Sequence, residues 1–256
     1  MVGVLNEMPR APVPGLYVGA GGWHYFLVPS DRLVSYSKCF KFVEVNSSFY
    51  AYPTLRAAYG WRKRVPEDFV FAVRANREIT HGRKLLLCEE TVKAQEYMKR
   101  LCEALRSEAL VYTMPPSFEP SEENLARARE FFNEAERGRF KLAFETRGRL
   151  WGSASAREAL RKVLAEADVT HSVDISYQEP VYANDLVYAR IFGPARETTG
   201  RNQYSLRGDQ MDKVVRKAGE HLRGGKRVMV AFHTVKMYED AARMVRKAKT
   251  AGQACG

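Results

Sequence analysis

The chain has 256 residues, of which 45% are hydrophobic and 28% charged, as in an ordinary soluble globular protein. This length suits one large α/β domain or two small ones. No apolar run reaches the roughly eighteen residues of a membrane-spanning helix, and residues 1–14 lack a basic segment followed by an apolar one. We therefore expect no membrane association and no secretory signal, but a cytoplasmic protein with a short N-terminal arm over residues 1–14.

The charge balance favours anionic partners. Lysine and arginine number 41 against 30 aspartates and glutamates, which gives a net charge of +11. Such an excess attracts nucleic acid, nucleotides or sugar phosphates, although solvated basic helix faces produce the same total. The four cysteines, Cys39, Cys88, Cys102 and Cys255, form no C-x-x-C pair, so a zinc site of the usual spacing is not expected.

Strand and helix patterns alternate along the chain. Eight runs are predicted strands: residues 16–22, 40–46, 69–76, 109–115, 141–147, 170–176, 186–193 and 227–234. Predicted helices include residues 89–106, a helix that begins after Ser121, and residues 153–166, 209–222 and 237–249. Gly224-Gly225 is expected to end the penultimate helix.

Eight such units over about 250 residues predict a single-domain α/β fold, a (β/α)8 TIM barrel over residues 15–252. An open doubly wound sheet is the competing fold. It usually has a glycine-rich turn that leads from a strand into a helix and cradles a phosphate. Here the glycine-rich residues 19–22 lead into Trp23-His24-Tyr25, which is not a helix start, so we do not interpret them as a nucleotide fingerprint.

Polar residues replace apolar ones near the ends of several predicted strands. Because strand side chains alternate between two faces, a polar residue between two helix-facing valines points into the barrel. This parity sends inward Glu44, Asn46, Arg74, Asn76, Glu145, Arg147, Asp174, Arg190 and His233. Catalytic residues of TIM barrels lie at these carboxyl-terminal strand ends, so the pattern predicts where an active site lies.

Short motifs occur in order over most of the chain. They include Gly21-Gly22-Trp23, Val43-Glu44-Val45-Asn46 with Phe49-Tyr50, Met114-Pro115-Pro116-Ser117-Phe118, and Phe144-Glu145-Thr146-Arg147 followed by Trp151, with further matches at residues 66–74, 79–81, 189–190 and 204–205. In order and spacing these motifs resemble the YecE-like family, also called domain of unknown function 72. The resemblance implies a TIM barrel but no particular reaction, since a fold does not determine a function.

The chain departs from the family pattern at several places, and the Gly-x-Ala expected after the last strand is not clear in residues 235–238. Arg74 stands where the family usually has lysine, Phe192-Gly193 where it has His-Gly, and Phe232-His233-Thr234 where it has Phe-Asn-Asn. The chemistry on that side of the site is therefore expected to differ from that of the usual member.

Carboxylates supply the candidate catalytic groups. Glu145 and Asp174 would divide the acid and base roles if their environments separate their pKa values. Glu44 lies across the barrel, and His81 is a further candidate for proton transfer. The alternative is a salt-bridge network that braces the barrel, since three acids and three arginines cancel in charge. These carboxylates with His233 could also hold a divalent metal, but interleaved arginines repel cations, so a metal is not favoured and the cofactor stays unknown.

Basic and aromatic residues supply the candidate binding groups. Arginines would hold an anion, aromatic rings would stack on a base, and the loop after the seventh strand would bind phosphate, as it does in many barrels. The predicted substrate-binding residues are Arg147, Arg190, Arg74, Asn46, Trp23, Tyr50, Trp151, Arg196 and Arg201.

Three hypotheses for the function follow. The first is a hydrolase or lyase, nuclease-like, acting on a phosphate-bearing substrate such as DNA, RNA or a nucleotide. The second is a glycosidase-like or sugar-metabolising barrel, which paired carboxylates near tryptophans would suit. The third is a non-catalytic module that binds nucleic acid or protein, in which the inward charges only stabilise the barrel. The oligomeric state does not follow from the sequence.

Overall fold

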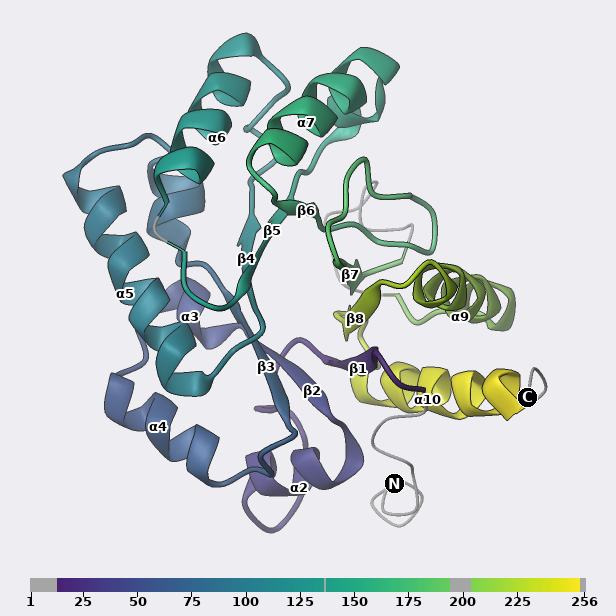
Figure 1. The fold of residues 1–256 in the computed structure, drawn as a ribbon. Coiled ribbons are helices and arrows are strands. Elements are labelled where there is room, and N and C mark those ends of the chain that lie inside the picture. Colours follow the sequence, from purple (N-terminus) through teal and green to yellow (C-terminus); the bar gives the residue numbers. More distant parts are fainter. Residues whose placement is uncertain (1–12, 136, 194–203, 254–256) are drawn as a thin grey trace.

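A computed structural model describes residues 13–135, 137–193 and 204–253, and within this part of the chain eight parallel strands form one sheet rolled into a barrel (Figure 1). The strands are β1 (Leu16–Ala20), β2 (Phe42–Val45), β3 (Val70–Arg74), β4 (Ala109–Thr113), β5 (Lys141–Glu145), β6 (Thr170–His171), β7 (Leu186–Ile191) and β8 (Arg227–Phe232). They pair in the order β6-β5-β4-β3-β2-β1-β8-β7. The predicted TIM barrel is confirmed, and it sets all strand ends at one mouth.

Helices connect most of the strands and lie outside the barrel (Figure 1). They are α2 (Arg32–Cys39), α3 (Ser47–Tyr50), α4 (Leu55–Lys63), α5 (Glu89–Leu105), α6 (Glu122–Glu134), α7 (Ala154–Glu166), α9 (Gly208–Arg223) and α10 (Met237–Gln253), with helical turns η1 (Glu78–Gly82) and η2 (Arg149–Gly152). The side chain of Ser121 caps α6 by accepting the N–H of Asn124, as predicted. Gly224 caps the end of α9, and Gly225 after it has φ of +78°, a conformation that glycine adopts without strain.

The strands alternate as the sequence pattern requires. Val43 and Val45 belong to the large core between the strands and the helices, whereas Phe42 packs inside the barrel with Ala72 and Tyr188. Glu44 has the same parity as Phe42 and is fully buried. On β2, β3 and β7 the inward row thus passes from an apolar or aromatic residue inside the barrel to a charged one nearer its mouth, as in Phe42 and Glu44, Ala72 and Arg74, and Tyr188 and Arg190.

The sixth strand is much shorter than residues 170–176, the range predicted for it. Regular pairing ends at His171, and a single bridge between Val173 and Ala189 then joins this segment to β7. The Arg190 N–H donates to the Val173 carbonyl at 3.0 Å, while the Asp174 carboxylate accepts the N–H groups of Phe192 and Gly193. A side chain therefore takes the place of the backbone ladder at this seam of the barrel.

Two sequence expectations concern other parts of the chain. The N-terminal arm, residues 1–14, falls almost entirely outside the described residues. Among the helices of the described part, none combines the length and the apolar character that crossing a bilayer would require.

Candidate functional site

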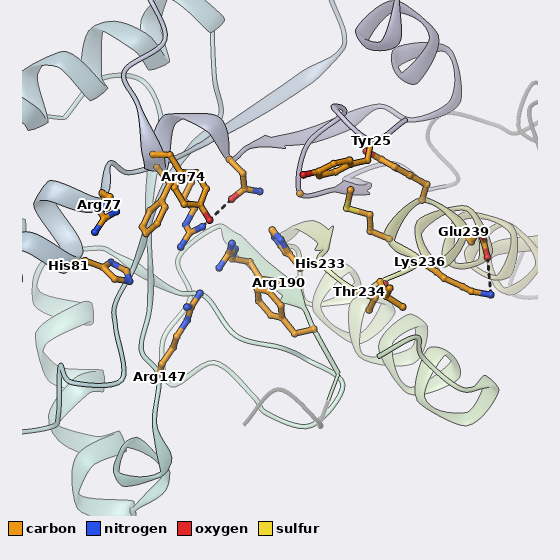
Figure 2. Close-up of a pocket in the computed structure, with 18 residues that line it drawn as sticks. Tyr25, Arg74, Arg77, His81, Arg147, Arg190, His233, Thr234, Lys236 and Glu239 are labelled. Atoms are coloured by element: carbon orange, nitrogen blue, oxygen red, sulfur yellow. Dashed lines mark hydrogen bonds and ion pairs between the residues drawn. The ribbon is translucent and has the colours of Figure 1, made fainter. Parts of the chain in front are cut away.

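A cleft of about 950 Å³ opens at the carboxyl-terminal ends of the strands. Its lining comes from the ends of β1, β2, β3, β5, β7 and β8 and from the loops after them. Arg74, Arg77, His81, Arg147 and Arg190 converge on it from one side, and Tyr25, Lys236 and Glu239 lie on the other (Figure 2). Five lysines and arginines but a single acid, Glu239, line the cleft, so its surface is strongly cationic.

Arg190 lies at the centre of the cleft floor and is only 2% exposed. Its Nε donates to Oε2 of Glu44 at 2.9 Å and its Nη2 to Oε1 at 3.0 Å, a bidentate pair that links β7 to β2. Nη1 donates to Glu145 on β5, and the Tyr188 hydroxyl donates to Glu44 at 2.8 Å. Arg190 is therefore held from two directions and serves as a rigid floor.

The protonation of this buried pair is settled by its charges. Burial alone would raise the pKa of Glu44, but Arg190 and His233 outweigh it and hold that pKa well below its usual value. Burial likewise acts to lower the pKa of Arg190, and Glu145 and Glu44 raise it above its usual value instead. Both groups stay ionised, so Glu44 is poorly suited to proton transfer at neutral pH.

Glu145 is engaged on both oxygens. Oε2 accepts from Arg190, and Oε1 accepts from Nε of Arg147 at 2.7 Å. Arg147 is partly exposed and lines the cleft, whereas Glu145 is 7% exposed. Two carboxylates, Glu44 and Glu145, thus neutralise two guanidinium groups.

Arg74 is the guanidinium group of the cleft floor with which neither Glu44 nor Glu145 forms an ion pair. Nε donates to Oγ1 of Thr113 at 2.9 Å, Nη1 reaches Oδ1 of Asn46 only at 3.5 Å, and the guanidinium stacks 3.6 Å above the Phe49 ring. No carboxylate of the described residues lies within ion-pair distance of it, although it is only 9% exposed. Burial, with repulsion from Arg190 and Arg147, lowers the pKa of Arg74 to about 9. A buried cation without a counter-ion is unfavourable unless a ligand supplies one.

His81 stands on the same side of the cleft as Arg74 (Figure 2). Its Nδ1 lies 2.9 Å from the Thr80 hydroxyl, and its ring meets the Phe49 ring edge-on at 4.9 Å. Burial, then Arg74, Arg147 and Arg77, lowers the pKa of His81 to about 4. At neutral pH His81 is therefore an uncharged imidazole among cations.

Asp174 lies beside the cleft rather than in it. It lines a smaller hollow of about 370 Å³ that adjoins the cleft across Arg147, Arg190 and Phe192. Its Oδ2 accepts the backbone N–H groups of Phe192 at 2.8 Å and Gly193 at 2.9 Å, and Oδ1 accepts that of Ser176 at 2.9 Å. Burial raises the pKa of Asp174 against these hydrogen bonds. This geometry fits a tether between two strand ends, and its catalytic role stays a prediction.

His233 completes the floor on the β8 side. Its Nε2 lies 3.2 Å from Oε1 of Glu44, and its ring stacks on Phe192 with centroids 4.6 Å apart. A Cβ at Gly21 would lie 2.4 Å from Nδ1, so only glycine lets the end of β1 approach this imidazole.

The remaining predicted binding residues divide by place. Asn46 and Tyr50 line the cleft, and Tyr50 is 71% exposed. Trp23 instead packs edge-on against Trp61 at 5.2 Å, and buried Trp151 stacks on Phe118 and donates to its carbonyl at 2.8 Å. Neither tryptophan lines the cleft. Arg196 and Arg201 lie outside the described residues.

Two basic residues of the cleft, Arg77 and Lys236, were not predicted from the sequence. Both lie in the short segments that follow β3 and β8, and a count of basic residues in every such segment would have found them. Tyr188 was also missed, although it lies two residues before Arg190 and so shares its face.

The lining of the cleft has a chemistry that suits anions. A guanidinium group can donate two parallel hydrogen bonds to the oxygens of one phosphate, and here several guanidinium groups surround a partly enclosed space. In the described part of the chain no three His, Cys, Asp or Glu side chains are grouped so that they could hold a metal ion.

Comparison with known proteins places the chain in its family. The model of the DUF72 family, described as "Protein of unknown function DUF72", matches residues 17–255. The UPF0759 protein YunF of Bacillus subtilis (strain 168) is 30% identical over 170 residues, which are 62% of this chain and 60% of that protein. The match therefore spans less than two thirds of this curated relative.

Solved structures agree on the fold. A DUF72 family protein from Enterococcus faecalis V583 has a TM-score of 0.73 at 20% identity, with 92% of this chain and 97% of that chain covered. A xylose isomerase domain containing protein of Salmonella typhimurium LT2 has 0.57 at 13% (88% and 93% covered), and endonuclease IV of Thermus thermophilus has 0.51 at 14% (84% and 89% covered). These similarities concern the barrel alone. Since the family model spans nearly the whole chain, this protein belongs to the DUF72 family, the YecE-like family of unknown function.

Proposed function

We propose that this chain is an enzyme that binds the phosphate group of a nucleotide or nucleic acid at Arg74 and cleaves a neighbouring bond. The observation that carries the proposal is the buried guanidinium of Arg74, for which the described residues provide no carboxylate within ion-pair distance. A phosphate seated there would meet Arg74, Arg147 and Arg77 within one cleft. The net charge of +11 would draw polyanions to it.

The candidate proton-transfer group of this proposal is His81. It is uncharged at neutral pH and lines the cleft next to the proposed phosphate position. A bound phosphate would offset the arginines that depress its pKa and so make it a better base. Glu145, by contrast, accepts hydrogen bonds from Arg147 and Arg190, which suits positioning of Arg147.

This distribution of charge favours the phosphate-bearing substrate over a neutral sugar. A glycosidase needs one carboxyl group that carries a proton and one that does not. Here Glu44 and Glu145 both pair with the same arginine, and the pKa of Glu44 is held well below its usual value, so Glu44 does not suit the role of the proton-carrying carboxyl group. The similarity to endonuclease IV, which is a nuclease by its name, concerns the fold and adds only that such a barrel accommodates this chemistry.

The test measures binding and turnover with matched variants. Labelled DNA, RNA and a nucleoside monophosphate are titrated at low salt, and cleavage is followed with and without divalent cations. Arg74→Met removes the proposed anchor, and Arg56→Met, at an exposed position outside the cleft, removes an equal charge. We expect Arg74→Met to weaken phosphate binding by about 10- to 100-fold, the loss of one strong charge-assisted contact, and His81→Ala to reduce turnover.

The unphosphorylated nucleoside is the negative control for the ligand. Equal losses in Arg74→Met and Arg56→Met, or no binding at low salt, would contradict the proposal. Phosphate binding that depends on Arg74, without turnover of any substrate, would contradict the enzymatic part and support a binding module.

A further inference from the structure

Two tyrosine rings at the rim of the cleft are exposed to solvent. Tyr25, in the loop after β1, is 72% exposed, and Tyr50, at the end of α3, is 71% exposed. Both line the cleft. Tyr25 meets only an edge of His24 and Tyr50 only an edge of Phe49 among ring contacts of the described residues. Large rings exposed beside a cationic cleft offer flat faces for stacking.

Cationic groups extend along the cleft beyond its floor. Arg77 lies at the η1 side and Lys236 at the α10 side, with Arg74, Arg147 and Arg190 between them (Figure 2). Lys236 has only Glu239, 3.7 Å away at a solvent-exposed position, and no carboxylate of the described part pairs with Arg77. One phosphate cannot contact both ends, so the charges fit a ligand with several phosphates in a row.

We propose that the occupant of this cleft is a single-stranded nucleic acid, with its phosphates on the arginine row and unpaired bases on Tyr25 and Tyr50. This assignment rests on the proposed function, because it takes Arg74 as the phosphate anchor. It commits to one ligand class within the phosphate-bearing substrates.

Accessibility separates a single strand from a duplex. Arg74 is 9% exposed at the bottom of the cleft, where a flexible strand can lower one phosphate. Bases in a duplex already stack on their neighbours, so they cannot also cover the two tyrosines. A mononucleotide would leave one end of the cleft empty, because the cleft has a volume of about 950 Å³, which is at the upper end for small-molecule sites.

Fluorescence anisotropy with a labelled strand of about 12 nucleotides tests the assignment. The strand is compared with the duplex of the same sequence and with a mononucleotide, each over a range of salt. We expect the strand to bind tightest, with a slope of log K against log salt of about −1.4 or steeper, which corresponds to two or more phosphates. Tyr25→Ala and Tyr50→Ala should each weaken strand binding by about 5- to 100-fold and leave the binding of inorganic phosphate, which has no base to stack, nearly unchanged.

Matched variants make the result specific. Tyr25→Phe and Tyr50→Phe keep the ring and should bind like the wild type, and Tyr59→Ala removes an exposed ring of α4 that lies outside the cleft. Equal affinity for strand and duplex, or unchanged strand binding in both alanine variants, would overturn the assignment while Arg74-dependent phosphate binding stood. If the wild-type protein bound none of the phosphate-bearing ligands, the proposed function would be overturned as well. None of these tyrosines is buried, so misfolding does not confuse the comparison.

Discussion

At the scale of single residues, the three arginines of the cleft floor differ in what neutralises them. Arg190 has Glu44 and Glu145, and Arg147 has Glu145. Arg74 has only a hydroxyl, a distant amide oxygen and an aromatic face. A residue that is costly to bury and leaves its charge unmatched is typical of a ligand site, where stability is given up for binding.

His81 provides a pH-dependent prediction at the same scale. Its pKa is lowered to about 4 by burial and by three arginines. A bound anion offsets those arginines, so the pKa should rise on binding, and anion affinity should increase as the pH falls from 7 towards 5. NMR titration of the imidazole protons with and without sulfate, which keeps its charge over this range, measures both midpoints. An unchanged His81 midpoint would contradict the placement of the anion, and exposed His24 outside the cleft is the internal control.

At the scale of elements, strand parity explains how much of the site the sequence could predict. The runs containing Glu44, Arg74, Glu145 and Arg190 become strands whose inward faces carry these residues, because a period of two leaves one choice once the valines face the helices. A salt-bridge network across the barrel was an expected alternative, but which acid pairs with which arginine could not be predicted, since it depends on the register between strands far apart in the chain. The short β6 could not be predicted either, because the Asp174 carboxylate replaces ladder hydrogen bonds there.

The link between β2 and β7 gives a stability prediction. Glu44→Gln leaves Arg190 with one carboxylate and should lower the free energy of unfolding by about 3–5 kcal/mol, the usual effect of breaking a buried ion pair. Because the folded pKa of Glu44 is depressed, its contribution is present above the unfolded-state pKa and is lost as pH falls through the lower folded value. Urea unfolding at pH 7 and at pH 3 should therefore show a larger difference between variant and wild type at pH 7. A loss below about 1 kcal/mol at pH 7 would show that Glu44 is not a brace.

At the scale of the whole molecule, the barrel gathers charge that the chain spreads over 256 residues. The ends of β3, β5, β7 and β8 and the segments after them bring five cations and one acid to a single mouth, while Glu44 lies buried below it. Composition predicts an anionic partner but not this location, because charge totals say nothing about fold. Trp23 and Trp151 were predicted to bind substrate because they occur in motifs, but a motif does not reveal that their rings pack against Trp61 and Phe118.

The most direct test of the account pairs binding with stability in one variant, Arg74→Met. Methionine keeps the apolar contact with Phe49 and removes the buried charge. Isothermal titration with inorganic phosphate and urea unfolding are measured on the same preparations, with Arg56→Met as control. The account predicts a loss of phosphate affinity of about tenfold or more with unfolding free energy unchanged or raised by about 1 kcal/mol. Unchanged phosphate affinity with a clear loss of stability would show instead that Arg74 is structural and would contradict the central claim.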